Sequence, residues 1–356
     1  MRARFETGPL KHQITVAGSG FWRELEFNNS VAPGGLSNLY APRILARPTF
    51  PSFTCIRQIS NLQINRSVSI SDTISMFDDR LLLTLGGRLQ GIAAKSYNQT
   101  VGPTLGFATS RYDDSALTPA VGLVVKPLDG LSLYGNYIEG LVAGGVAPAT
   151  ASNAGEVFAP VVSRQKEVGV KYDFGTLGVS FAAFDIERPS SFTDAATRRF
   201  SVDGMQRNQG LEFNLFGEPI QGVRFVGGVA LIDGELLKTA NGTFDGRVAP
   251  GVPKVNVSLY GEYDMPSWLL RGLTATGRVI YSSPQYFDQA NTQKIADWTR
   301  LDAGLRYSFL GSWGKPVTLR ANVENVLGTN YWASTGGGRL TLGNPRTYVV
   351  SAQFDF

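Results

Sequence analysis

The sequence predicts an all-β protein, and specifically a transmembrane up-and-down antiparallel β-barrel. Three observations support this fold class. Apolar residues recur at every second position in segments along the whole chain, a spacing that places them on one face of a strand. Aromatic residues gather near the ends of these segments, and long connections alternate with short ones. The combination is typical of outer-membrane barrels.

The composition of the 356 residues excludes several other classes of protein. Only 17% of the residues are charged, whereas 11% are aromatic, which argues against a disordered chain. The one cysteine, Cys55, cannot form an internal disulfide, and the one histidine, His12, cannot supply a site with two histidine ligands. No apolar run approaches the roughly 18 residues that a transmembrane helix needs. The residues after Met1 to Arg4 are not apolar enough for a secretory signal, so we expect none in the sequence as written.

Segments with alternating apolar residues give about fourteen expected strands. In the clearest one, apolar residues occupy the odd positions from Leu301 to Phe309, and polar residues lie between them. Segments 167–174, 255–259, 317–324 and 347–356 repeat the pattern. In chain order, the expected strands start near residues 10, 60, 80, 115, 131, 163, 177, 207, 223, 252, 270, 297, 316 and 347.

The connections between these strands alternate in length. Short ones fall near residues 78–79, 127–130, 175–176, 217–222, 265–269 and 311–315. Long ones fall near residues 29–58, 99–114, 142–162, 191–206, 238–250, 287–296 and 333–346. Because every second connection is long, all long loops should emerge at one end of the sheet and all tight turns at the other.

A soluble sandwich or barrel also alternates, with its apolar face turned inward. Three features favour a membrane instead: both signs of charge on the polar faces, two distinct loop sets, and aromatic residues near the strand ends. These aromatic residues are Tyr134, Tyr137, Tyr172, Phe174, Phe216, Tyr263, Trp268, Tyr281, Trp298, Phe309, Trp313, Tyr331 and Trp332. A propeller would need a repeat of about 40 to 45 residues, and the sequence has none. Scattered Lys and Arg residues form no nucleic-acid patch and are expected to line the wet interior of the barrel, paired with Asp and Glu.

Several short segments occur in a characteristic order across most of residues 10–356. They are 165–173 (QKEVGVKYD), 183–188 (AFDIER), 204–212 (GMQRNQGLE), 298–302 (WTRLD) with Tyr307, 322–332 (NVENVLGTNYW), 343–347 (GNPRT) and the terminal Phe356. In this order and spacing the chain resembles the C-terminal part of a TonB-dependent siderophore receptor of the ferrichrome-receptor type.

The resemblance implies a barrel of about 22 strands in the bacterial outer membrane, plugged by a separate N-terminal domain. Residues 1–356 are then expected to be the C-terminal part of the barrel domain. About eight strands, the plug, the TonB-contacting segment and the signal peptide would be missing. We therefore expect a truncated product, a fragment, or a chain that a second polypeptide completes.

The resemblance also implies transport of a ferric siderophore, driven by TonB, with no bond made or broken. Because the siderophore already wraps the iron, neither a protein metal site nor a cofactor is expected. Siderophore capture uses aromatic rings and a few polar anchors. Tyr286, Phe287, Trp332 and Arg339 lie near expected extracellular loops and are candidate contacts, although rings at strand ends also form membrane girdles.

Phe356 and the alternating strand before it resemble the family's assembly signal for the outer-membrane insertion machinery. Two alternative functions stay open on the sequence. One is a passive porin-like channel, if the barrel closes without a plug. The other is an outer-membrane hydrolase, for which His12 is the single available histidine base.

Overall fold

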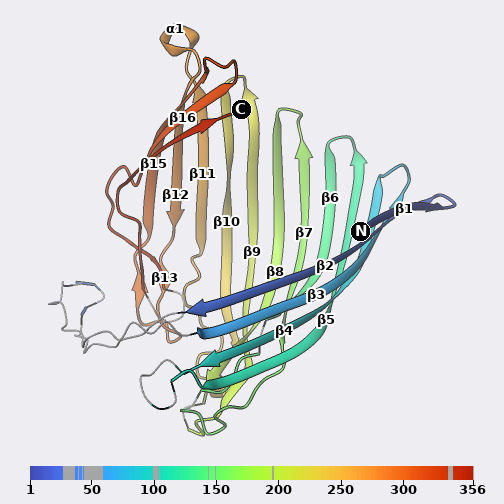
Figure 1. Ribbon diagram of the computed structural model, residues 1–356, viewed down its shortest axis with the longest axis vertical. Coiled ribbons are helices and arrows are strands. Elements are labelled where there is room, and N and C mark those ends of the chain that lie inside the picture. The colour runs from blue at the N-terminus through green and yellow to red at the C-terminus, as the bar shows by residue number, and fades with distance from the viewer. Residues whose placement is uncertain are drawn as a thin grey trace.

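One antiparallel sheet dominates the computed structural model, which describes residues 1–26, 37–38, 40–41, 43, 59–98, 103, 105–142, 144–148, 150–194, 196–335 and 340–355. Its fifteen described strands lie side by side in chain order (Figure 1). They are β1 (Arg2–Thr7), β2 (Leu10–Glu26), β3 (Ile59–Met76), β4 (Leu81–Tyr97), β5 (Ala108–Leu128), β6 (Leu131–Val142), β7 (Val161–Asp173), β8 (Leu177–Thr193), β9 (Phe200–Ile220), β10 (Val223–Lys238), β11 (Val255–Asp264), β12 (Leu273–Ser282), β15 (Trp298–Leu310), β16 (Pro316–Glu324) and β19 (Thr347–Phe354).

Smaller elements lie in the connections. Two short hairpins pair β13 (Gln285–Tyr286) with β14 (Lys294–Ile295) and β17 (Trp332–Ser334) with β18 (Thr341–Leu342). A 3-10 turn, η1, covers Ala240–Gly242, and one helical turn, α1, covers Ser267–Leu270. Within the described ranges, neither helical segment is long and apolar enough to cross a bilayer.

The predicted all-β fold is confirmed, and each of the fourteen expected strands is present, but the count was one too low. The missed strand is β1, which pairs with β2 from Arg2↔Thr15 to Thr7↔Leu10. Its six residues include Arg2, Arg4 and Glu6, so its apolar signal is too short to stand out from an ordinary polar terminus.

The predicted alternation of connections is also confirmed. Short turns lie at the upper end of the sheet in Figure 1 and long connections at the lower end. The tight turns depend on left-handed backbone: in the turn between β3 and β4, Phe77, Asp78 and Asp79 all have φ between 53° and 64°. Gly130 has φ 78°, and a Cβ atom there would lie 2.6 Å from the carbonyl oxygen of Asp173. These turns fix the strand register.

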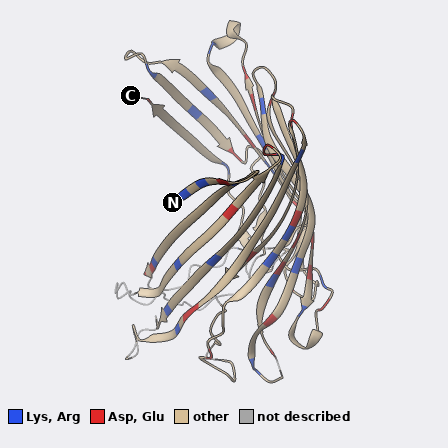
Figure 2. Cartoon of the chain, turned by 90° about the vertical axis from the view of Figure 1, so that its right-hand side faces the viewer, with Lys and Arg blue, Asp and Glu red and all other residues tan. Residues whose placement is uncertain are grey.

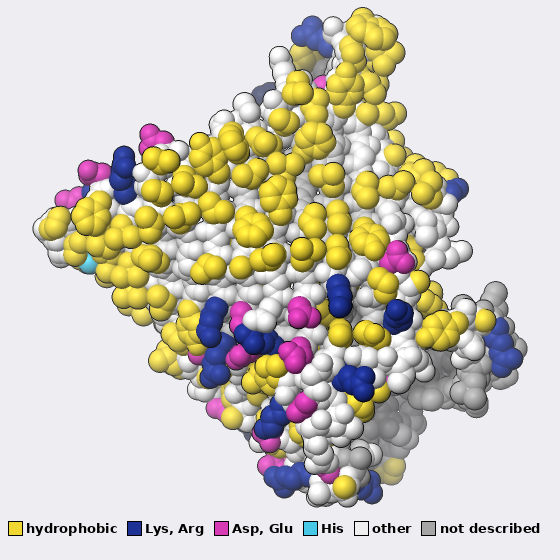
Figure 3. Space-filling model, turned by 180° about the vertical axis from the view of Figure 1, so that it is seen from behind, with side chains coloured by type: hydrophobic (Ala, Val, Ile, Leu, Met, Phe, Trp, Pro, Cys, Tyr) yellow, Lys and Arg dark blue, Asp and Glu magenta, His cyan; other side chains and the backbone are white. Residues whose placement is uncertain are grey.

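The sheet is a single curved layer (Figure 2). Register places apolar side chains of successive strands on the same face, as in the row Val68↔Leu89↔Leu117. Val68 is 61% exposed and Leu117 is 68% exposed, so no second protein layer covers them. From behind, apolar side chains spread across this convex face (Figure 3), which we call the apolar band. A soluble sandwich is therefore wrong for this chain, because its apolar face would be covered.

The expectation that charged residues line only the wet interior was wrong in part. Asp185 and Arg207 form an ion pair on the convex face, and Figure 3 shows further charged side chains there, toward the long connections. A strand needs about 9 to 11 residues to cross a bilayer, whereas β9 has 21. The strands thus continue beyond the apolar band, and their outer portions face water on both sides.

Aromatic pairs line the short-turn end of the apolar band. Tyr172 lies 4.4 Å from Phe174 and Tyr307 lies 5.3 Å from Phe309, measured between ring centroids. Such rings suit a membrane interface. Tyr134 departs from the expected girdle, because register places it on the concave face, where its hydroxyl donates to Glu167 Oε1 at 2.7 Å.

Candidate functional site

The concave face is the polar side of the same register. On β9 to β12 it carries Asn214, Ser258 and Arg278 together with the small residues Gly228 and Ala230. Because the small residues leave room between larger neighbours, the wall is hollowed here by two adjoining cavities of about 360 and 510 Å³. Arg278 borders both cavities and donates to Ser258 Oγ at 3.2 Å. The wall can therefore offer a cation to anything that fills the concavity.

An ionic cluster holds the wall together near the short-turn end. Glu262 accepts two hydrogen bonds from Arg306 at 2.8 Å each and one from Arg224 at 2.9 Å. Arg224 also donates to Asp264 at 2.8 Å. Glu262 has an 11% exposed side chain. Its carboxylate compensates Arg306, and together with Asp264 it compensates Arg224.

A second polar group lies on β15, near the long connections. Arg300 donates to Asp302 at 2.7 Å and lies 3.6 Å from Glu324. The Trp298 ring stacks on Tyr331 with 4.4 Å between centroids. Two buried donors, Trp298 Nε1 and Arg300 Nε, have no hydrogen-bond partner among the described residues. An acceptor supplied by a ligand or by another polypeptide segment would satisfy them.

The three candidate contacts in the described part of the chain, Tyr286, Phe287 and Trp332, lie in connections that pack together. The carbonyl oxygen of Tyr286 accepts from the Thr335 hydroxyl at 2.8 Å and from the Gly251 backbone N–H at 3.0 Å. These contacts join connections 239–254, 283–297 and 325–346 at the long-loop end. The other two predicted residues, Arg339 and Phe356, lie outside the described residues.

Connection 283–297 is ordered by one carboxylate. Asp288 accepts from the Thr292 hydroxyl at 2.6 Å and from the Gln293 backbone N–H at 3.0 Å. The hydrogen bond from the Thr292 side chain, followed by that from the Gln293 backbone, lowers the pKa of Asp288 below its ordinary value of 3.8.

This shift predicts an acid-sensitive loop. Because the folded pKa is depressed, the stabilisation is complete above the ordinary value of 3.8 and is lost as pH falls through the lower folded pKa. We expect faster hydrogen exchange in 283–297 at acid pH, after correction for the intrinsic pH dependence of exchange. Asp288→Asn should abolish the acid-dependent increase, and an identical acid response in this variant would contradict the assignment.

Within the described ranges, no group of three or more His, Cys, Asp and Glu side chains is placed to hold a metal ion. The chain matches the family model for the TonB dependent receptor-like β-barrel over residues 3–326. The chain belongs to this TonB-dependent receptor family. The family comprises outer-membrane β-barrel receptors.

Similar proteins extend the comparison. The ferrichrome receptor FcuA of Yersinia enterocolitica is 35% identical over 365 residues, which cover 100% of this chain and 47% of that receptor. The ferrichrome outer membrane transporter/phage receptor of Escherichia coli is 28% identical, with the same two coverages. The crystal structure of BauA, the ferric preacinetobactin receptor of Acinetobacter baumannii, superposes with a TM-score of 0.80 at 37% identity and covers 100% of this chain and 53% of BauA. The chain thus spans about half the length of the receptors that it matches.

Family membership also bears on the hydrolase alternative. His12 Nδ1 lies 2.7 Å from Asp72 Oδ2, and its Nε2 lies 2.8 Å from the Thr7 hydroxyl. The Phe5 ring stacks on the imidazole with 4.9 Å between centroids. The contacts of His12 with the Thr7 hydroxyl, the Phe5 ring and the Asp72 carboxylate therefore connect β2 to β1 and β3. The relatives in this TonB-dependent receptor family are receptors and transporters.

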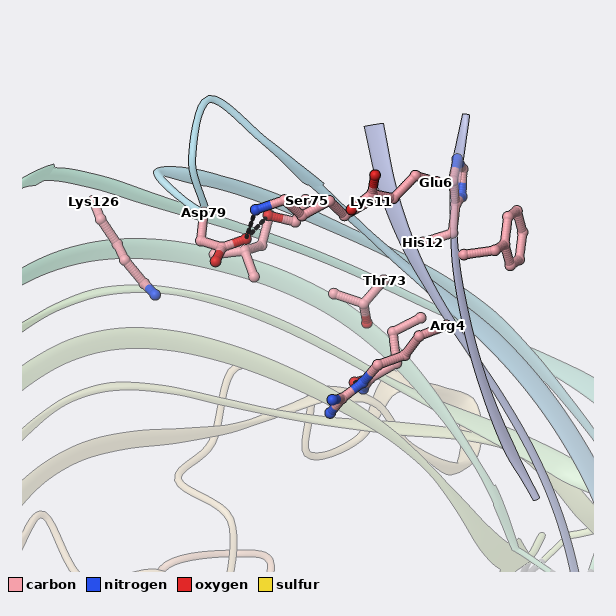
Figure 4. A pocket seen from close by; sticks show the side chains of 11 residues that line it. Arg4, Glu6, Lys11, His12, Thr73, Ser75, Asp79 and Lys126 are labelled. Atoms are coloured by element: carbon pink, nitrogen blue, oxygen red, sulfur yellow. Dashed lines mark hydrogen bonds and ion pairs between the residues drawn. The ribbon is translucent and has the colours of Figure 1, made fainter. Parts of the chain in front are cut away.

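A cavity of about 550 Å³ adjoins His12 at the short-turn end (Figure 4). Lys11 Nζ lies 4.0 Å from Asp79, and the Ser75 hydroxyl donates to the same carboxylate. The Ser75 hydrogen bond, followed by the charge of Lys11, lowers the pKa of Asp79. The carboxylate therefore stays ionised in this turn and links β2 to β3.

Proposed function

We propose that this chain forms most of the wall of an outer-membrane receptor that takes up ferric siderophores with energy from TonB. The observation that carries the proposal is the single-layer sheet, with an apolar convex face for lipid and a polar concave face for a wet interior. The receptors that it resembles are named for ferrichrome and for ferric preacinetobactin. Both names describe iron held by an organic ligand, so the iron is cargo in this proposal.

We also propose that further strands close the barrel. β1 and β19 are the two edges of the described sheet and are not paired with each other. Unpaired edges in lipid would leave backbone N–H and C=O groups without partners. With fifteen strands here, about seven more would complete a barrel of about 22. The additional polypeptide would also supply the plug and the segment that contacts TonB.

Siderophore contact is placed at the long-loop end in this proposal. Tyr286, Phe287 and Trp332 supply rings there, and Arg339, which lies outside the described residues, is the cation that the sequence adds to this set. The sequence offered no reason to include Trp298 and Arg300. They now join the set because Trp298 Nε1 and Arg300 Nε have no hydrogen-bond partner among the described residues. Siderophores carry oxygen acceptors around the iron, and such acceptors suit these donors.

Replacing ligand contacts should reduce transport selectively. We expect Tyr286→Ala and Trp332→Ala each to lower uptake of radioactive iron given as ferrichrome by about tenfold, a loss of about 1.4 kcal/mol in binding. The assay uses receptor-deficient cells that express the complete receptor. Phe174→Ala, at the opposite end of the sheet, is the matched control and should transport normally. Equal uptake by all three variants would contradict the placement of the site.

Assembly gives a separate prediction. We propose that Phe356 contributes to recognition by the insertion machinery, as the alternating strand before it suggests. Deleting Phe356 should reduce the amount of receptor in the outer membrane, measured by the folded band on an unheated gel, while total synthesis is unchanged. Adding an alanine after Phe356 tests whether a terminal position is required, and full insertion after the deletion would contradict this role.

A steady current distinguishes the receptor from a passive channel. The complete receptor in a planar bilayer should conduct little, since a plug fills the lumen. A large steady conductance would support the porin-like alternative and would overturn the proposed TonB-dependent transport.

A further inference from the structure

The turn between β11 and β12 differs from the other short connections. It contains eight residues, 265–272, whereas the other six contain two to five. The additional residues form α1, which projects from the upper end of the sheet in Figure 1. Tight turns suffice elsewhere at this end, so the greater length of this one requires a separate explanation.

The tip of this turn exposes three large apolar side chains. Trp268 is 83% exposed, Leu269 is 54% exposed and Leu270 is 43% exposed. The turn reads MPSWLLRG, so it contains no carboxylate and carries one cation, Arg271. A run of exposed apolar residues is unfavourable in water, and Trp beside Leu and a basic residue is the composition of a segment that lies in a membrane interface.

The apolar tip is continuous with the apolar band. Tyr263 at the end of β11 is exposed in the same row as Leu305 of β15, and Phe309 is exposed further along that face of β15. Figure 3 shows apolar side chains extending from the convex face up to the tip. The tip therefore extends the surface that faces lipid, in the direction of the short turns.

The backbone of the turn is suited to a poorly hydrated environment. The Leu269 N–H donates to the carbonyl oxygen of Pro266 at 2.9 Å, and the Met265 N–H donates to that of Leu273 at 2.8 Å. Internal hydrogen bonds lower the cost of removing peptide groups from water. Arg271 follows the helical turn and can pair with a lipid phosphate.

We propose that α1 is a membrane anchor that inserts Trp268, Leu269 and Leu270 into the periplasmic leaflet of the outer membrane. Its partner is phospholipid, with acyl chains against the three side chains and a headgroup phosphate against Arg271. Lipid fits better than a protein partner because the tip projects from the end of the sheet and continues a lipid-facing surface. The inference rests on the membrane placement proposed above, but not on the identity of the siderophore.

The depth of the tip can be measured directly. Cys55→Ser removes the one cysteine of residues 1–356, and any cysteine in the remaining polypeptide is replaced in the same way. Leu269→Cys then accepts a fluorescent label in the complete receptor. The receptor is reconstituted in vesicles of phosphatidylethanolamine and phosphatidylglycerol that contain doxyl-labelled lipid. The matched control is Asp129→Cys, in the two-residue turn between β5 and β6. We expect several-fold stronger quenching by doxyl lipid at position 269 than at 129, and the opposite order for aqueous iodide.

Equal access of iodide to both positions, without lipid quenching at 269, would overturn the anchor. A label shielded only after addition of a periplasmic extract would overturn it in favour of a protein partner. Because labelled variants can fail to insert, the unmodified receptor is also cross-linked to a phospholipid with a photoactivatable acyl chain. Peptide 265–272 should carry the cross-link, and its absence there despite cross-links on β11 and β12 would contradict the proposal. Iron uptake by cells that express the same variants tests the transport function independently.

Discussion

Replacing Glu262 with Leu is expected to lower the free energy of unfolding by about 2 to 4 kcal/mol. Glu262 compensates Arg224 and Arg306, and it also accepts from the Tyr260 hydroxyl at 2.8 Å. The two arginines have side chains that are 32% and 25% exposed. Leucine would leave them close together without their shared carboxylate, and water reaches them only in part. Because water reaches the two arginines in part, the expected loss of stability is smaller than the loss for a fully buried ion pair.

Urea unfolding in detergent micelles, followed by tryptophan fluorescence, measures this loss. Glu218→Gln is the matched control, because Glu218 lies 4.0 Å from Arg224 and is 42% exposed. Its removal should cost less than about 1 kcal/mol, as for other exposed pairs. Glu262→Gln should fall between the two, since the amide retains one acceptor but loses the charge. Equal midpoints for Glu262→Leu and Glu218→Gln would show that the cluster does not stabilise the wall.

The strands were predictable because a membrane sheet imposes one rule on every strand. Lipid on one face and water on the other require alternation. β15 obeys it along nearly its whole length, and β7 obeys it from Val168 onward. The sequence did not predict where each strand leaves the bilayer, because the alternation continues beyond the membrane. The Asp185–Arg207 pair on the convex face shows why: a charge at an outward position is favourable once the strand has passed the headgroups.

The site was predictable only as a region. The loops have no periodic pattern, so the sequence indicates which residue types they contain but not which residues come into contact. The contact between the Tyr286 carbonyl oxygen and the Thr335 hydroxyl therefore could not be predicted. Trp298 was expected in the membrane girdle because it begins a strand. Register instead places it opposite Ser282, on the concave side with Arg278. A shift of one position in register moves a side chain from the lipid face to the lumen face. The face can therefore be assigned only when the neighbouring strand and its pairing are known.

Asn325 holds together a network of hydrogen bonds at the long-loop end, and Asn325→Ala is expected to cost about 3 to 5 kcal/mol. The residue is 1% exposed. Its Nδ2 donates to the carbonyl oxygens of Thr329 at 2.9 Å and Asn344 at 3.0 Å, and its Oδ1 accepts from the Thr329 N–H at 2.9 Å. Alanine would remove all three bonds and leave the peptide groups of Thr329 and Asn344 without these partners.

The cost of Asn325→Ala has two contributions, the lost hydrogen bonds and the strain of alanine in the backbone conformation at this position. The φ of Asn325 is 52°, a conformation that Asn and Gly tolerate better than Ala. Asn325→Gly should therefore lose the hydrogen bonds without the strain and be about 1 kcal/mol more stable than Asn325→Ala. Asn330→Ala, in an exposed neighbour, is the control and should stay within about 0.5 kcal/mol of the parent. Urea unfolding gives these differences.

Transport should report the same defect, because connection 325–346 carries Trp332 and positions Tyr331 against Trp298. A loop that no longer holds its turn presents these rings in many orientations, so ordering them on binding reduces affinity. We expect Asn325→Ala to weaken siderophore binding while Glu262→Leu, at the opposite end of the wall, lowers stability with a smaller effect on affinity in the folded fraction. Equal affinities for the two folded variants would mean that Asn325 stabilises the barrel without positioning the binding loops.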